Sequence, residues 1–391
     1  MITSIIRPCF IIFFCILIPI SNSLYHTYSY GLFLFALALQ IGYGLFLNKR
    51  IFLYSIIIIF IQILLTSGLN FKAVASGFVL IYCCVVFFEI GYQYYNKKIQ
   101  DDINIYLIFY VLLCTLVLVS HGLHVFFNFK LIYQGSKPCF PFEEPSHFAL
   151  FMGPIFIGLS SKFSLRRRFL FSLLLIFFSF YFQSLVFLIF SFISLTLNLL
   201  SLLPIKKAAQ IFYSIVLLTI VLDYFIIDSY LYSRLIHVFD PNTINISALV
   251  YLQGWNSIID SLSNHVFGIG FQFLGHEPPN FYSLRIQELS GNFVNRQDGG
   301  FFLAKFISEL GYLGLLIVIC ATLQTSLIFK RFSSSHAHDL RFIYFIFCGL
   351  IVPLLIRDVG YFSYTIFYLC AGLGFLSSIS GGRVPPQADQ R

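Results

Sequence analysis

The feature that most limits the fold of this chain is a succession of uncharged, apolar runs, many of them about 20 residues long. At a rise of about 1.5 Å per residue, a helix of this length crosses a hydrocarbon core of about 30 Å. Only 10% of the 391 residues are charged and 59% are hydrophobic, whereas a soluble domain carries about a quarter charged residues. The sequence therefore predicts an all-α polytopic membrane protein.

The apolar runs between polar breaks predict about twelve transmembrane helices. The stretch 169–203 would measure about 50 Å as one straight helix, so a break is expected at Gln183-Ser184. The first run is interpreted as a span because Ser21-Asn22-Ser23 is not followed by a signal-peptide cleavage site. The expected helices are 5–20, 27–47, 51–66, 73–94, 104–127, 145–161, 169–181, 184–203, 208–227, 299–329, 342–356 and 359–379.

The distribution of basic residues predicts the orientation. Sixteen of the 24 lysines and arginines fall on the side of the N-terminus, which the positive-inside rule makes cytoplasmic. Both termini are then cytoplasmic. The chain divides into 1–227, with helices one to nine and a short external loop at 128–145; a large external loop at 228–298; and 299–391, with helices ten to twelve and a cytoplasmic tail. The net charge of +8 is read as membrane orientation, and no nucleic-acid partner is expected.

The large loop is 71 residues long and has the pattern of a folded segment. Around the only tryptophan, Trp255, apolar residues recur at helical spacing opposite a polar face. Such a helix suits the headgroup region of membrane lipids, where the ring would anchor it. Trp255 is also a candidate substrate-binding residue. The apolar stripe is Leu249, Leu252, Trp255, Ile259 and Leu262, and the polar face is Gln253, Asn256, Ser257 and Asp260.

The short external loop ends in two carboxylates and a histidine at the mouth of a span, in the run Pro141-Phe142-Glu143-Glu144-Pro145-Ser146-His147-Phe148-Ala149. Ionisable groups at a membrane span indicate function, so Glu144 is a candidate catalytic residue and His147 a candidate substrate-binding residue. The structural alternative is a helix start, with Pro145 in the first turn and acids favoured by the helix dipole. A serine hydrolase is not indicated, because no G-x-S-x-G turn surrounds Ser146.

The large loop supplies candidate anion-binding and proton-accepting residues. Arginine donates parallel hydrogen bonds to phosphate and keeps its charge, so Arg234, Arg285 and Arg296 are candidates for binding phosphates. The alternative for each is a surface ion pair. His276 and Asp298 are candidate bases, although Asp298 also suits the N-cap of the helix that follows.

The other ionisable residues form an expected ion pair but no pattern typical of a metal or cofactor site. Lys305 and Glu309, four residues apart on the helix after the large loop, are expected to pair with each other. The histidine pairs lack a third ligand at suitable spacing, and the nine cysteines form neither a zinc pattern nor a disulfide framework.

Three segments stand out together: Phe142-Glu143-Glu144-Pro145-Ser146-His147-Phe148-Ala149, Ser247-Ala248-Leu249-Val250-Tyr251-Leu252-Gln253-Gly254-Trp255 and Phe267-Gly268-Ile269-Gly270-Phe271. In sequence and in their place along the chain they resemble the Wzy-type O-antigen polymerases. These enzymes link oligosaccharide repeat units at the outer face of the bacterial inner membrane, in lipopolysaccharide biosynthesis. The resemblance covers the layout of nearly the whole chain, whereas the sharp motifs are confined to these segments.

The resemblance implies a GT-C-like fold and a metal-independent, inverting glycosyltransferase whose large loop is periplasmic. The donor would be a glycan on undecaprenyl pyrophosphate, and the acceptor a single undecaprenyl-pyrophosphate-linked oligosaccharide. A chain-length regulator and a flippase are the candidate protein partners. Arg234 and Arg296 would stabilise the departing phosphates, and Glu144, His276 or Asp298 would accept the proton.

Two departures bear on this resemblance. Family members often carry arginines in the shorter external loop, whereas this chain has Lys130 and Lys137, which keep the charge without the bidentate fork. The related O-antigen ligases typically carry a His-Asn pair before the helix that follows the long loop, where this chain has Gln297-Asp298-Gly299. That difference favours a polymerase over a ligase.

Three other functions stay open: an O-antigen ligase, a lipid-linked oligosaccharide flippase or other transporter, and a non-catalytic assembly protein. Transporters are commonly built from repeated halves with sites near the bilayer midplane. Here the halves do not match and the polar groups gather outside the spans.

Overall fold

The computed structural model describes residues 2–25, 27–45, 53, 56–57, 71–93, 97–127, 139–200, 210, 214, 240, 242–332 and 337–380, and within these ranges it is helical without strands. The spans expected near 51–66 and 208–227 lie largely outside the described residues, as does Arg234. The helices are α1 (Ile2–Tyr25), α2 (Ser29–Tyr43), α4 (Phe71–Tyr92), α5 (Lys97–Phe127), α6 (Pro145–Ser160), α7 (Leu165–Tyr181), α8 (Leu185–Leu200), α11 (Ile246–Asn264), α12 (Phe281–Ser290), α13 (Phe302–Phe332), α14 (Ala337–Leu355) and α15 (Tyr364–Ser380).

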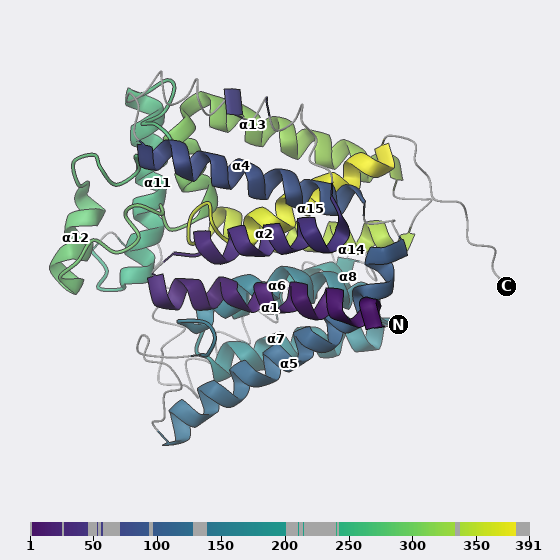
Figure 1. Ribbon diagram of the computed structural model, residues 1–391. Helices are drawn as coiled ribbons and strands as arrows, with labels where there is room; N and C mark the ends of the chain where they lie inside the picture. The colour runs from purple at the N-terminus through teal and green to yellow at the C-terminus, as the bar shows by residue number, and fades with distance from the viewer. Residues whose placement is uncertain are drawn as a thin grey trace.

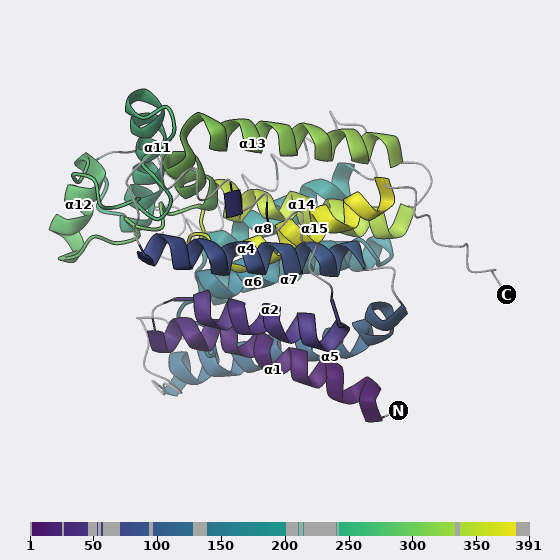
Figure 2. The ribbon, with the colours of Figure 1, turned by 45° about the horizontal axis from the view of Figure 1, so that its top comes forward.

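The apolar helices run side by side in one bundle, and α11 lies across one end of it (Figures 1 and 2). The start of α1 and the end of α15 lie at the opposite end. Because consecutive helices alternate in direction, the connections before α2, α6 and α15 reach the end that carries α11 and α12. We call this the loop end of the bundle.

Among the described residues, four helices are long and apolar enough to cross a membrane. They are the segments Arg7–Tyr25, Ala73–Tyr92, Ile108–Phe127 and Phe302–Leu327, and α2, α6, α8, α14 and α15 contain shorter apolar helices. The expected break in 169–203 is confirmed, since α7 ends at Tyr181 and α8 begins at Leu185. Gln183 turns the chain there with a φ of 48°, and α7 and α8 pack against each other.

Small residues allow some of these helices to approach closely, as is common between membrane helices. The Cα of Gly91 on α4 faces the backbone of Ala371 on α15, and an added Cβ would come within 1.8 Å of the Ala371 carbonyl oxygen. Gly374 lies against the carbonyl oxygen of Phe88 in the same way. The α4–α15 contact therefore has no room for larger side chains.

The large loop is docked on the kinked start of α13. Gly311, with a φ of 61°, interrupts α13, and the chain at Val266–Gly270 hydrogen-bonds to the backbone at this kink. Ile269 and Gly270 donate to the carbonyls of Ser308 and Glu309, and Tyr312 donates to that of Val266. The loop thus returns to the bundle at the Phe267–Phe271 segment.

Helix α11 packs on α13 through a face that the sequence did not predict. Gly254 lies against Gly299 and Phe301, and the Ser261 hydroxyl donates to the Ser308 carbonyl at 2.6 Å. The prediction that Gln253 belongs to the polar face is wrong, because its side chain is buried. The packed face contains Gly254, Ile258 and Ser261, whereas Trp255 and Ile259 of the predicted stripe remain exposed. Trp255 is 37% exposed, with its ring 5.3 Å from that of Phe301.

Candidate functional site

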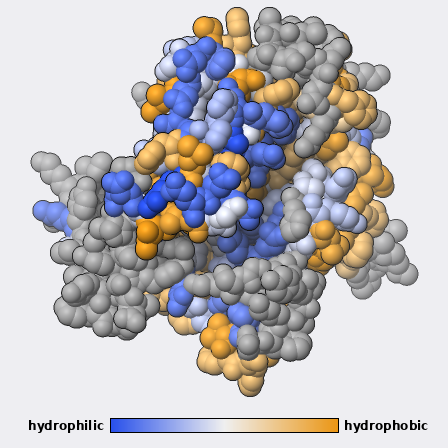
Figure 3. All heavy atoms as spheres, turned by 90° about the vertical axis from the view of Figure 1, so that its left-hand side faces the viewer, coloured by the Kyte–Doolittle hydropathy of each residue, from blue (hydrophilic) through white to orange (hydrophobic). Residues whose placement is uncertain are grey.

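Ionisable side chains from three distant parts of the sequence meet at the loop end of the bundle. They come from the start of α6, from the end of the large loop with the first turns of α13, and from the connection between α14 and α15. Figure 3 faces this end and shows hydrophilic residues gathered across its middle, with a hollow beside them. We call this set the loop-end cluster: Glu144, His147, Asp298, Lys305, Glu309, Arg357 and Asp358.

The cluster has two halves, one with Glu144, His147 and Arg357 and the other with Asp298, Lys305 and Glu309. Glu144 is the N-cap of α6 and lies at the centre of the first half. Its side chain makes no capping hydrogen bond, so the carboxylate is free for other contacts. It accepts hydrogen bonds from the Ser146 hydroxyl at 2.6 Å and from Arg357 at 3.2 Å. His147 Nε2 lies 3.3 Å away, as the spacing of three residues on a helix favours. Glu144 therefore stands at a helix start, as the structural alternative predicted, and also contacts other ionisable residues.

The electrostatics of this half keep Glu144 ionised. Burial acts to raise the pKa of Glu144, but His147 and Arg357, with the Ser146 hydrogen bond, outweigh it and lower the pKa to about 2. Its side chain is still 43% exposed. Glu144 is therefore an accessible carboxylate that is ionised near neutral pH, and it is better suited to holding a cation than to accepting a proton.

Arg357 was missed as a site residue from the sequence. It lies between α14 and α15, and its side chain is 21% exposed. Its Nε is buried and has no hydrogen-bond partner among the described residues, so the guanidinium keeps a donor that its neighbours do not use. The available signal was a basic residue on the side that the sequence predicts to be external, where the positive-inside rule disfavours it.

Lys305 forms the second cationic centre of the cluster. Its ammonium donates to the Gln297 carbonyl at 2.7 Å and to the Gln272 side chain at 3.3 Å. It lies 3.7 Å from Glu309, which confirms the predicted pair, and 3.9 Å from Asp298. Lys305 therefore links the loop to the buried start of α13.

Glu309 is fully buried and fastens the large loop. Its carboxylate accepts hydrogen bonds from the backbone N–H groups of Gln272 at 2.9 Å and Leu274 at 3.4 Å. A buried carboxylate is retained only with such partners, which here are Lys305 and the loop backbone. Its role is to hold the loop segment against α13.

Asp298 is the accessible carboxylate of the second half. Its side chain is 44% exposed. Partial burial, which removes water from the carboxyl group, raises the pKa of Asp298, whereas the charges of Lys305 and Arg357 act to lower it. Gly360, at a φ of 83°, brings the α14–α15 connection against it, and a Cβ there would lie 2.8 Å from Oδ1. A raised pKa and an open side chain make Asp298 the better proton acceptor of the two carboxylates.

Asp358 is a further residue that the sequence did not single out. It is buried, and its carboxylate accepts from its neighbour's backbone, Val359 N–H, at 2.8 Å and from the Ser363 hydroxyl at 3.1 Å. Burial raises the pKa of Asp358 to about 7, and the nearby Asp298 adds to the shift. Its backbone N–H donates to the Gly300 carbonyl at 2.8 Å, which ties the α14–α15 connection to the end of the large loop.

The described candidates Arg285, Arg296 and His276 lie outside the contacts of the cluster. Arg285 pairs with Glu288 at 2.9 Å on the exposed side of α12, as the surface-pair alternative expects. Arg296 donates to the Glu277 carbonyl and lies over the Phe293 ring. His276 is exposed, with Nδ1 3.2 Å from the Phe273 carbonyl.

This arrangement can bind an anionic group and accept a proton beside it. Arg357 and Lys305 supply positive charge, and Asp298 is the accessible base near both. Among the described residues no group of three or more histidine, cysteine or acidic side chains is placed to hold a metal ion. No protein-family model, curated protein or solved structure matched the chain.

Proposed function

We propose that this chain is an O-antigen polymerase of the bacterial inner membrane, with about twelve spans, a GT-C-like fold and its loop end in the periplasm. It transfers a growing glycan from undecaprenyl pyrophosphate to a lipid-linked repeat unit. The observation that carries the proposal is the loop-end cluster, in which two cations and an accessible carboxylate with a raised pKa meet at one end of an apolar bundle.

In the proposed reaction a hydroxyl of the acceptor sugar attacks the anomeric carbon of the donor glycan. The bond from that carbon to the pyrophosphate oxygen breaks, and the configuration inverts. Asp298 takes the hydroxyl proton, while Arg357 and Lys305 stabilise the charge that develops on the departing pyrophosphate. Glu144 does not react; it holds the Arg357 guanidinium through the 3.2 Å hydrogen bond.

The energy for the transfer resides in the glycosyl pyrophosphate, so neither a nucleotide nor a metal is required by the proposal. Arginine suits the departing group, because its fork donates parallel hydrogen bonds to phosphate oxygens. Arg234 and Arg296 remain proposed contributors from the large loop. The chain-length regulator and the flippase remain proposed partners.

The test is the surface glycan of cells that carry Arg357→Gln as their only copy. We expect the protein at its normal level in the membrane and a surface glycan of one repeat unit. Arg166→Gln is the matched control, because Arg166 is an exposed arginine of α7 at the opposite end of the bundle. Normal chain length in Arg357→Gln would overturn the assignment, and loss of all surface glycan would point to a flippase or a ligase.

A further inference from the structure

An apolar cavity of about 310 Å³ lies inside the bundle, between α1, α2, α4, α5, α6, α14 and α15. Its wall is formed almost entirely by aliphatic and aromatic side chains, among them Leu39, Ile155 and Phe367, together with the thiol of Cys15. Ligand pockets typically measure about 300–1,000 Å³, and native interiors leave few voids larger than a water molecule. A cavity of this size in a packed bundle calls for an apolar occupant.

Three tyrosines of the cavity wall, Tyr110, Tyr364 and Tyr368, differ in whether their hydroxyl has a hydrogen-bond partner. Tyr110 donates to the Met152 carbonyl and Tyr368 to the Phe151 carbonyl, both at 2.8 Å, so their hydroxyls are satisfied by α6. The Tyr364 hydroxyl is buried and makes no hydrogen bond among the described residues. An unsatisfied buried hydroxyl is costly and uncommon, which indicates a missing acceptor.

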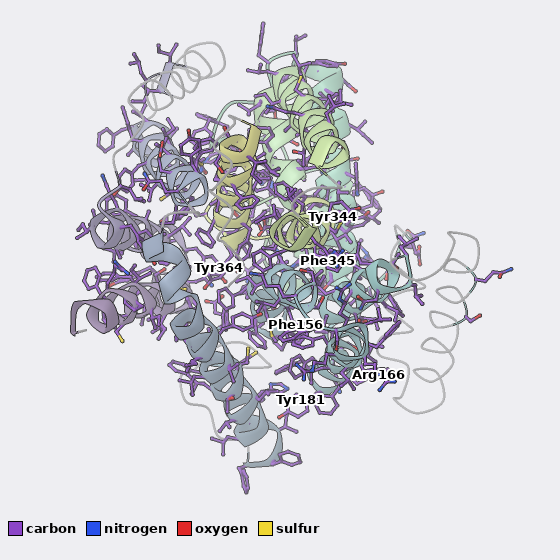
Figure 4. The ribbon with its side chains drawn as sticks, turned by 90° about the vertical axis from the view of Figure 1, so that its right-hand side faces the viewer. Phe156, Arg166, Tyr181, Tyr344, Phe345 and Tyr364 are labelled. Atoms are coloured by element: carbon purple, nitrogen blue, oxygen red, sulfur yellow. The ribbon has the colours of Figure 1, made fainter. Side chains whose placement is uncertain are left out.

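Tyr364 also joins the cavity to the loop-end cluster. It is the first residue of α15 and lines a second, smaller pocket together with Tyr28, His147 and Asp358. His147 is in turn 3.3 Å from Glu144. In Figure 4, which looks along the helices, Tyr364 lies well inside the bundle, whereas Arg166 and Tyr181 lie toward the side formed by α7. One ring therefore separates an apolar space from a charged one.

We propose that this cavity binds the phosphate-proximal isoprene units of a polyprenyl phosphate or pyrophosphate, with the Tyr364 hydroxyl donating to an oxygen of its phosphate end. The inference rests on the proposed function and adds a binding site for the lipid part of the substrate. The apolar wall takes the chain, and the charged cluster beyond Tyr364 takes the phosphate. The cavity holds only the first units, and the rest of the chain lies in the bilayer.

The chain-binding half is tested by photocrosslinking. Purified protein in nanodiscs is irradiated with undecaprenyl phosphate that carries a diazirine near its phosphate end, and the adducts are mapped by mass spectrometry. We expect adducts on the cavity walls of α1, α6 and α15, and a loss of most of them in Cys15→Phe, which fills part of the cavity. Cys320→Phe is the matched control, because Cys320 is exposed on α13 and does not line the cavity.

The headgroup half is tested by Tyr364→Phe, which removes only the hydroxyl. We expect its affinity for undecaprenyl phosphate to fall about tenfold, as loss of a hydrogen bond to a charged group predicts, and its affinity for uncharged undecaprenol to stay unchanged. Tyr344→Phe, on the partly exposed surface of α14, is the control and should bind both lipids normally. Equal loss of both lipids in Tyr364→Phe would contradict the hydrogen bond.

The outcomes separate this inference from the proposed function. Adducts confined to the outer surface of the bundle, or full displacement of the probe by phosphatidylglycerol at equal concentration, would overturn the cavity as a polyprenyl site. Cavity adducts in a protein that never extends a glycan would uphold the site and overturn the polymerase. Extension that Cys15→Phe and Tyr364→Phe leave intact would uphold the polymerase and overturn the site.

Discussion

The guanidinium of Arg357 donates to the carboxylate of Glu144 at 3.2 Å, across 213 residues of sequence. The contact joins the start of α6 to the connection between α14 and α15, and the Glu144 side chain is 43% exposed to solvent. Because each partner comes from a different part of the bundle, the pair fixes the position of the Arg357 cation. The proposed reaction needs that cation in place.

The first prediction concerns the shape of this cation. Arg357→Lys keeps the charge and loses the planar fork, so the folded protein should persist while glycan extension slows by at least about tenfold. The measurement is the rate of extension with purified protein at matched concentrations. A wild-type rate in Arg357→Lys would mean that any positive charge suffices and that bidentate binding has no part.

The second prediction concerns the proton acceptor. Asp298 has to be ionised to accept a proton, and its pKa is raised, so the rate should fall as pH is lowered, beginning above the pH at which an ordinary aspartate titrates. Asp298→Asn should remove this acidic limb of the pH–rate profile together with most of the activity. The limb should remain in Asp358→Asn, since the buried Asp358 carboxylate already accepts hydrogen bonds from the Val359 N–H and the Ser363 hydroxyl and takes no proton from the acceptor in the proposed reaction.

The third prediction concerns stability and pH. The pKa of Asp358 is raised from 3.8 to about 7 in the folded protein, so between these values the folded state binds more protons than the unfolded state. The free energy of unfolding therefore falls as pH rises across this window. Thermal unfolding in detergent should show a lower Tm at pH near 7.5 than near 5. Asp358→Asn should flatten this dependence, and an unchanged slope in that variant would exclude Asp358 as its source.

The fourth prediction concerns the docking of the large loop on α13. A Cβ at Gly311 would lie 2.3 Å from the Gly268 nitrogen and 2.4 Å from the Val266 oxygen. Gly311→Ala should therefore detach the loop segment, which fluorescence of the single Trp255 and limited proteolysis would report. Gly291→Ala is the control, with a similar positive φ and open space around it, and should cost only about 1–2 kcal/mol. Equal effects in the two variants would contradict the docking.

Local spacing accounts for the parts of the site that could be predicted from the sequence. Glu144 and His147 are three residues apart and Lys305 and Glu309 four apart, so one helical turn brings each pair together. The break after Tyr181 follows from the length of an apolar stretch that no single span could accommodate. These features depend on helix geometry alone.

The rest of the site depends on tertiary packing. Arg357 and Asp358 were passed over because their partners stand far away in the sequence, at Glu144 and Gly300. The rotation of α11, which buries Gln253, depends on contacts with the end of the large loop and the start of α13, among them those of Gly254 and Ile258. Hydropathy could not reveal it, because the apolar Trp255 and Ile259 remain partly exposed.

Reconstitution shows whether this protein extends a glycan without any partner. Purified protein in liposomes is given lipid-linked repeat units alone, and the products are separated by size. The proposal predicts a ladder of glycans that differ by one repeat unit, absent in Asp298→Asn and present in Arg166→Gln. Repeat units that remain single with the wild-type protein, or a ladder that persists in Asp298→Asn, would contradict the account.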